Sequence, residues 1–354
     1  MFDINEIMKR AKQANEQAVD TMKKSFEKSE EIIGRIEASS AEKDESVSLP
    51  EEEEQIDAYT QYQTEILGQL FGEDMGILSA ALEMLEMEDE NDEEELSFDL
   101  ELEQNMYTVL EETMSRIESL PEPESVSYQK DDPRWRQFGI LLSGIVSNLN
   151  SHDLSGMDVE EHIPVLEQKV VSIVRRFWGI DGRSDLLDMI RYLAQEGYIL
   201  KYQLYSEASL PEELMNEDMD DEDKESVNRT WRFVQRYKGQ YAPGFLAGWD
   251  VGRAAMLTRW GCYLGWITEG EAVGILWDLS QKIVEELHSW REFAQSYLFG
   301  GLMWKLLCGD SSAESYLGYI ADAATDLLVG KPEEDGGQWG SCPWPLQRKI
   351  GFTL

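Results

Sequence analysis

The residue types that could support chemistry are concentrated in one stretch, GWDVGR, which holds Asp250 and Arg253 three positions apart. On a helix this spacing places the carboxylate and the guanidinium on one face, and Arg259, two turns on from Asp250, could join that side. With Trp260 and Tyr297 as aromatic walls, the group would form a pocket that binds a carboxylate, a phosphate or an acidic side chain. The same residues would equally form a buried ion pair that fixes one helix against its neighbours. The ion pair is the simpler interpretation, and the sequence leaves both open.

Other catalytic patterns are missing from the sequence. There is no HExxH, GxSxG, P-loop or GxGxxG motif, and the three cysteines include no CxxC pair. Cys262, between Gly261 and Tyr263, is expected to be a small core residue. The three histidines share no ligand spacing: His152, His162 and His288. We therefore predict no catalytic, metal or cofactor-binding residues, and the sequence favours a non-enzymatic protein.

The charge of the chain is strongly acidic and unevenly distributed. The formal net charge is −40, from 71 acidic and 31 basic residues, and residues 38–130 alone hold 28 acidic and three basic residues. Such a surface repels phosphate backbones and anionic membranes, so we expect neither nucleic acid nor membrane as a partner. It favours a basic protein partner, although the acidity can also serve solubility alone. No signal-peptide core or long apolar run is present, which predicts a cytoplasmic protein.

Composition divides the chain into three parts. Residues 1–37 have apolar residues at spacings of three and four, which predicts an amphipathic helix. Residues 38–130 form an acidic region of linker and helices, with a disordered stretch over 38–57, an acidic block over 86–95 and a helix within 97–120. Residues 131–354 contain all eleven tryptophans and form the folded domain. Whether residues 1–37 dock on that domain is left open.

Within the third part, helix-start and helix-stop signals are frequent. Asp132 and Pro133 begin a helix that is expected to continue through ILLSGIVSNL. Further helices are predicted over 159–177, over 184–196 with Gly197 closing it, and from about 246 to a stop at Gly265. The glycines at 248, 252 and 261 would allow close helix approach.

Two motifs fix helix starts near the end of the chain. Thr268 with Glu271, and Ser289 with Glu292, have the spacing of capping boxes. Residues 216–225 are expected to be a solvated acidic loop, because they lack the glycine that an EF-hand loop requires. Strand periodicity is missing throughout. The predicted fold is all-α, an irregular multi-helix bundle with an acidic, partly disordered helical N-terminal extension.

Three segments carry a resemblance to a known family. They are FWGIDGRSDLLDMIRYLAQEGY (177–198), AGWDVGRAAMLTRWGCYLGWITEGEA (247–272) and HSWREFAQSYLFGGLMW (288–304). In order and spacing they resemble the bacterial YbeU/YbeR-like domain of unknown function, over roughly residues 130–350. The resemblance implies an α-helical bacterial cytoplasmic domain and no particular activity. Members of that family often have a histidine where this chain has Tyr198.

Two functional hypotheses follow. The first is an acidic interaction protein that binds a basic protein, for which an immunity-type or antitoxin-like role is one concrete form. The second is an enzyme or small-ligand-binding domain with a site formed by Asp250, Arg253, Arg259, Trp260 and Tyr297. A toxin domain that carries its own acidic inhibitory segment is a third option.

Overall fold

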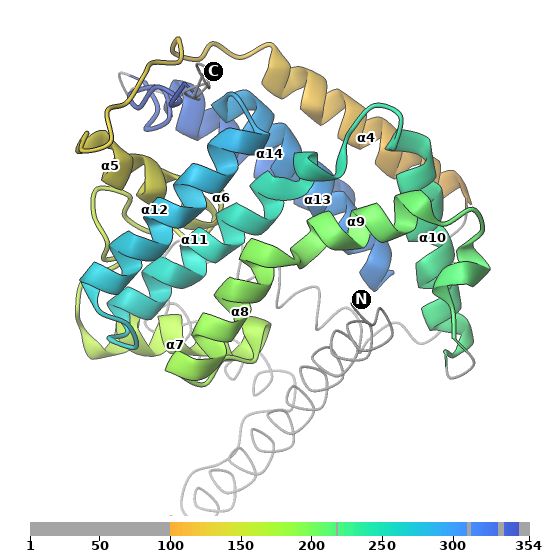
Figure 1. Ribbon diagram of the computed structural model, residues 1–354, viewed down its shortest axis with the longest axis horizontal. Coiled ribbons are helices and arrows are strands. Elements are labelled where there is room, and N and C mark those ends of the chain that lie inside the picture. Colours follow the sequence, from red (N-terminus) through yellow and green to blue (C-terminus); the bar gives the residue numbers. More distant parts are fainter. Residues whose placement is uncertain (1–99, 217–218, 310–312, 332–335, 347–354) are drawn as a thin grey trace, which may run out of the picture. The chain divides into compact units, whose positions relative to one another are not determined.

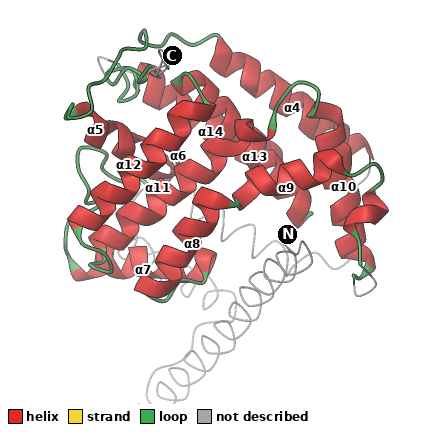
Figure 2. Cartoon of the chain, in the orientation of Figure 1, coloured by secondary structure: helices red, strands yellow, loops and turns green. Residues whose placement is uncertain are grey.

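The computed structural model describes residues 100–216, 219–309, 313–331 and 336–346. The expectations for residues 1–37 and for 38–99 lie outside these ranges. The described part is all-α, as predicted, with no strand in it (Figure 2). Its helices are α4 (Leu100–Glu118), α5 (Arg134–Leu141), α6 (Gly144–Leu149), α7 (Pro164–Trp178), α8 (Arg183–Gln195), α9 (Gly197–Glu207), η1 (Pro211–Leu214), α10 (Asp221–Tyr237), η2 (Pro243–Leu246), α11 (Ala247–Tyr263), α12 (Glu269–Glu286), α13 (Trp290–Cys308) and α14 (Ala313–Val329).

The described residues belong to two compact units. Residues 162–182, which contain α7, belong to one unit, and the remaining described residues belong to the other. None of the described helices combines the length and the apolar character that crossing a membrane requires.

Helix α11 is the central element of the larger unit. All of its 17 residues except Arg253 and Cys262 are buried, as expected of a helix covered on every side. It packs against α8, α12 and α13, which lie beside it (Figure 1). Helix α4 packs against α13 and α14, so this helix from the acidic region joins the tryptophan-rich helices.

Small residues let α11 approach its neighbours closely, as predicted. A Cβ atom at Gly248 would lie 2.5 Å from Ser296 Oγ of α13, and one at Gly252 would lie 2.8 Å from the Tyr297 ring. On the other side, a Cβ at Gly261 would overlap the Leu186 side chain of α8. The close contacts hold the side chains of α11 in fixed surroundings.

The helix predicted to run from Asp132 through residue 149 is in fact two helices. Between α5 and α6, the Ser143 hydroxyl bonds back to the Ile140 carbonyl at 2.7 Å. The Leu141 carbonyl accepts the Trp339 indole N–H at 2.9 Å. These bonds to side chains take the place of the backbone hydrogen bonds that would continue the helix, and the chain turns between α5 and α6.

Two other boundaries differ from the prediction. Helix α7 begins at Pro164 rather than near residue 159, because Ile163, held in an extended conformation before proline, cannot continue a helix backwards. The expected acidic loop over 216–225 is partly helix, since α10 begins at Asp221. Asp220 accepts the Asp223 N–H at 2.8 Å, and the acidic first turn suits the helix dipole.

The predicted capping signals near the end of the chain are largely confirmed. Thr268 and Glu271 form a full capping box at the start of α12. At α13 the Ser289 hydroxyl accepts the Glu292 N–H at 3.0 Å. The Glu292 carboxylate, however, accepts the N–H of His288 at 2.6 Å, so the second box is only half formed.

Candidate functional site

Asp250 lies in the first turn of α11 and caps the start of another helix. Its side chain is fully buried, and Oδ2 accepts the backbone N–H groups of Tyr198 at 2.8 Å and Ile199 at 3.2 Å. These are the first donors of α9, which a helix leaves unpaired. The contact requires Gly197, since a Cβ there would lie 2.4 Å from Oδ2 and its φ is +47°. Gly197 ends α8, as expected, and also begins α9.

Arg253 completes the surroundings of this carboxylate. Its Nη2 donates to Asp250 Oδ1 at 2.8 Å, and its Nε donates to the Trp249 carbonyl at 3.1 Å. The guanidinium carbon lies 4.2 Å from the centre of the Trp249 ring and 5.1 Å from that of Tyr198, within cation–π range. Burial raises the pKa of Asp250, and Arg253 together with the two backbone donors opposes that rise.

Tyr297 of α13 joins the same group through its ring. The ring centre lies 4.8 Å from that of Trp249, nearly edge-on, and burial raises the pKa of the Tyr297 phenol. The structure therefore brings three of the five sequence-predicted residues together: Asp250, Arg253 and Tyr297.

Arg259 lies elsewhere, six residues or about 9 Å further along α11. Its Nη1 donates to the hydroxyls of Ser143 at 3.1 Å and Ser147 at 3.0 Å. Its Nη2 donates to the carbonyls of Asp153, of Gly156 at 3.0 Å and of residue 158 at 3.2 Å. Burial lowers the pKa of Arg259 to about 10. This guanidinium anchors the loop after α6 and is engaged by the chain itself.

Trp260 also faces that loop and contacts a histidine. Its indole N–H donates to His152 Nε2 at 3.1 Å, and His152 Nδ1 lies 3.0 Å from Glu160 Oε1. Because an indole N–H can only donate, Nε2 must accept, and the imidazole proton lies on Nδ1, towards Glu160. A histidine–carboxylate pair is present, but the nitrogen that a general base would use already binds Trp260.

One cationic residue of the first group was missed by the sequence analysis. Lys201 of α9 is half-buried, and its Nζ lies 5.1 Å from the centre of the Tyr198 ring. Burial lowers the pKa of this amine, and the nearby positive charge of Arg253 adds to the effect. The signal that could have found it is the spacing of three between Tyr198 and Lys201, which places both on one face of α9.

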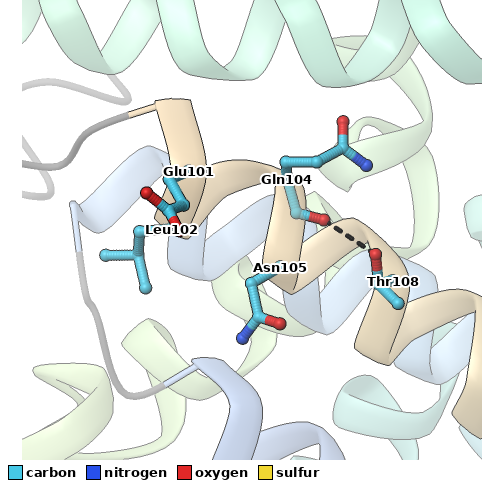
Figure 3. Close-up of a pocket in the computed structure, with 5 residues that line it drawn as sticks. All are labelled: Glu101, Leu102, Gln104, Asn105 and Thr108. Carbon is cyan, nitrogen blue, oxygen red and sulfur yellow. Dashed lines mark hydrogen bonds between the residues drawn. The ribbon is translucent and has the colours of Figure 1, made fainter.

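A surface hollow of about 540 Å³ lies beside α4, on a different part of the fold (Figure 3). Among its lining residues, Thr108 donates to the Gln104 carbonyl at 3.0 Å and Asn105 donates to Glu314 of α14 at 3.2 Å. The lining also includes Glu101 and Leu102, and none of the five sequence-predicted residues. The lining holds one carboxylate, Glu101, and one hydroxyl, Thr108, and that hydroxyl is engaged with the Gln104 carbonyl. In the part of the chain that the structure describes, no three His, Cys, Asp or Glu side chains cluster as metal ligands would.

Comparison with known proteins gives one match. Residues 173–344, slightly under half of the chain, match the family described as "Protein of unknown function (DUF1266)". This range includes α8 to α14 and with them all five sequence-predicted residues, whereas His152 and Glu160 lie before it. No curated protein and no solved structure matches the chain. The match indicates a shared domain and assigns no activity to it.

Proposed function

We propose that this chain is a non-enzymatic acidic interaction protein that binds a basic protein partner. An immunity-type or antitoxin-like role is one concrete form. The observation that carries the proposal is the formal net charge of −40, most concentrated in residues 38–130. A field of this sign and size accelerates encounter with a basic surface and disfavours acidic competitors.

Helix α4 supports the proposal because it presents part of this acidic region on a folded surface. One face of α4 is buried through residues such as Met106 and Leu110. Glu101 and Glu112 are exposed on the helix and have no ion-pair partner among the described residues. Because the helix is already folded, binding through these charges requires no further ordering of the backbone.

The polar groups of α11 and of the loop that faces it support the proposal in a second way. Asp250 caps α9, Arg259 anchors the loop after α6, and His152 is held between Trp260 and Glu160. Each of these groups has a structural partner within the chain.

The test is capture of partners by the tagged full chain at low salt, with identification by mass spectrometry. We expect a basic protein that is released by high salt, because salt screens exposed charges. We also expect its loss when the acids of residues 86–95 are changed to amides. Retention of no protein at low salt, or equal retention by the amide variant, would overturn the proposal.

A second pair of variants maps the surface. Glu101→Gln with Glu112→Gln removes two charges from α4, and Asp278→Asn with Glu285→Gln removes two exposed charges from α12. If α4 takes part in binding, the first pair weakens the complex more than the second. Equal effects would show that only total charge matters.

The finer family assignment is part of the same proposal. The three segments quoted above support a YbeU/YbeR-like domain of bacterial origin, and the acidic composition supports a cytoplasmic location. Cell fractionation of the tagged full chain in a bacterial host tests the location, and recovery in the membrane fraction would contradict it.

A specific observation favours a second candidate function, small-ligand binding beside Asp250 and Arg253. The indole N–H of Trp249 is buried and has no hydrogen-bond partner among the described residues, and buried donors are normally paired. Arg253→Ala tests this function. Loss of a ligand-induced thermal shift with the fold intact supports a site, whereas unfolding of the variant indicates a structural ion pair.

A further inference from the structure

The Tyr198 ring lies close to two cationic side chains. Lys201 Nζ and the Arg253 guanidinium carbon each lie 5.1 Å from its centre. The carboxylate nearest to them is Asp250, which already accepts two backbone N–H groups as well as Arg253. In a chain of net charge −40, this group is locally cationic.

Lys201 differs from arginines elsewhere in the larger unit in lacking a carboxylate. Arg183 pairs with Glu271 at 2.6 Å, and Arg232 pairs with Glu103 at 2.7 Å. Lys201 has no such ion pair with any described residue. A lysine amine that loses water without gaining a counter-ion is unfavourable, and buried lysines are usually paired.

The cationic group lies near the exposed end of α13. The exposed thiol of Cys308 lies within electrostatic reach of both Lys201 and Tyr198. Lys201 and Arg253 are both only partly buried, so this group lies at the edge of the core.

We propose that Lys201, with Arg253 as a second cation beside the same Tyr198 ring, binds an oxyanion, the carboxylate or phosphate group of a small ligand. This inference rests on the second candidate function and names its ligand class. The oxyanion supplies the counter-ion that Lys201 lacks. Trp249, whose buried indole N–H has no hydrogen-bond partner among the described residues, lies beside the same group, its ring centre 6.1 Å from that of Tyr198.

Isothermal titration of the full chain with inorganic phosphate, and separately with succinate, tests the proposal at fixed ionic strength. The variants are Lys201→Met, which keeps an apolar stem over Tyr198, and the control Lys238→Met. Lys238 is exposed and donates to the Ser206 carbonyl at 3.1 Å, so the control removes the same charge elsewhere. Arg253 is left intact because its loss would strand Asp250.

We expect wild type and Lys238→Met to bind at least one of the two anions. Lys201→Met should bind it about tenfold more weakly or worse, since it loses a charge-assisted bond. Binding of phosphate alone or succinate alone would identify the preferred group. Equal affinity in Lys201→Met and wild type, or no binding of either anion to wild type, would overturn the proposal.

Alkylation of the cysteines by iodoacetamide gives an independent readout. A bound anion disfavours the Cys308 thiolate and slows its alkylation severalfold, while Cys262, at the far end of α11, serves as the internal reference. Equal slowing of both cysteines would count against the site. If both assays fail, the oxyanion proposal is wrong. A non-anionic ligand at this site is then still tested by Arg253→Ala, and the basic-partner proposal is tested separately by the salt-dependent capture.

Discussion

The Asp250→Asn variant tests the structural role of the α11 carboxylate. The carboxylate accepts three hydrogen bonds, two from the start of α9 and one from Arg253, and it is fully buried. Asparagine has the same shape but only one acceptor oxygen. Its NH₂ group must therefore face either Arg253 or the two backbone donors of α9, so at least one buried donor loses its partner.

The magnitude follows from these contacts. An unsatisfied buried donor costs about 1–3 kcal/mol, and hydrogen bonds to a charged acceptor are worth about 1.5–3 kcal/mol each. Removal of one partner of a buried ion pair costs about 3–5 kcal/mol as a whole. We therefore expect Asp250→Asn to lower the free energy of unfolding by about 3–5 kcal/mol.

Urea denaturation measures this loss as a lower midpoint with an unchanged slope. Asp278→Asn, on the exposed face of α12, is the control and should change stability by less than about 0.5 kcal/mol. Hydrogen exchange should accelerate first at the amides of Tyr198 and Ile199. A loss below about 1 kcal/mol, or faster exchange spread evenly over the unit, would refute the capping role.

Three further predictions concern other parts of the fold. Arg259→Met leaves several buried carbonyls and hydroxyls unpaired, so we expect a loss of about 2–4 kcal/mol and faster hydrogen exchange in the loop after α6; unchanged exchange there would contradict the anchoring role. Gly300→Ala places a Cβ 2.4 Å from the Trp249 side chain, and this overpacking should lower the free energy of unfolding by about 1–3 kcal/mol. Gly274→Ala lies in open space on α12 and should instead raise the free energy of unfolding by about 0.4–1 kcal/mol. Equal shifts in Tm for the two variants would disprove the packing argument. The pKa of Glu271 is lowered to about 2 by the hydrogen bonds it accepts from its arginine partner and from the start of α12. Because the folded state then binds the proton more weakly than the unfolded state, stability should fall as the pH drops from about 4.5 towards 2; Glu271→Gln should flatten that part of a plot of Tm against pH, and an unchanged curve would contradict the assignment.

Local signals in the sequence determined where most helices begin and end. The capping box at Thr268 and the stop at Gly265 both involve residues only a few positions apart, and both are present in the structure. The start of α7 at Pro164 could also have been predicted from the sequence, because proline restricts the backbone of the residue before it. Close approach at Gly248, Gly252 and Gly261 followed from the absence of a side chain, although the sequence could not name the partner helices.

The break between α5 and α6 required the tertiary structure. It depends on Trp339, nearly 200 residues away, which takes the Leu141 carbonyl out of the helical ladder. No local pattern contains that contact, so the sequence predicted one continuous helix.

The candidate site shows the same division. Spacing placed Asp250 and Arg253 on one face of α11, and the ion pair between them is present at 2.8 Å. The same spacing argument suggested that Arg259 could join them, yet its guanidinium binds the loop after α6. The cap on α9 and the position of Lys201 depend on how α9 packs against α11, about 50 residues along the chain. Helix formation is decided by neighbours three and four positions apart, whereas the partner of a buried charge is decided by which helices pack together.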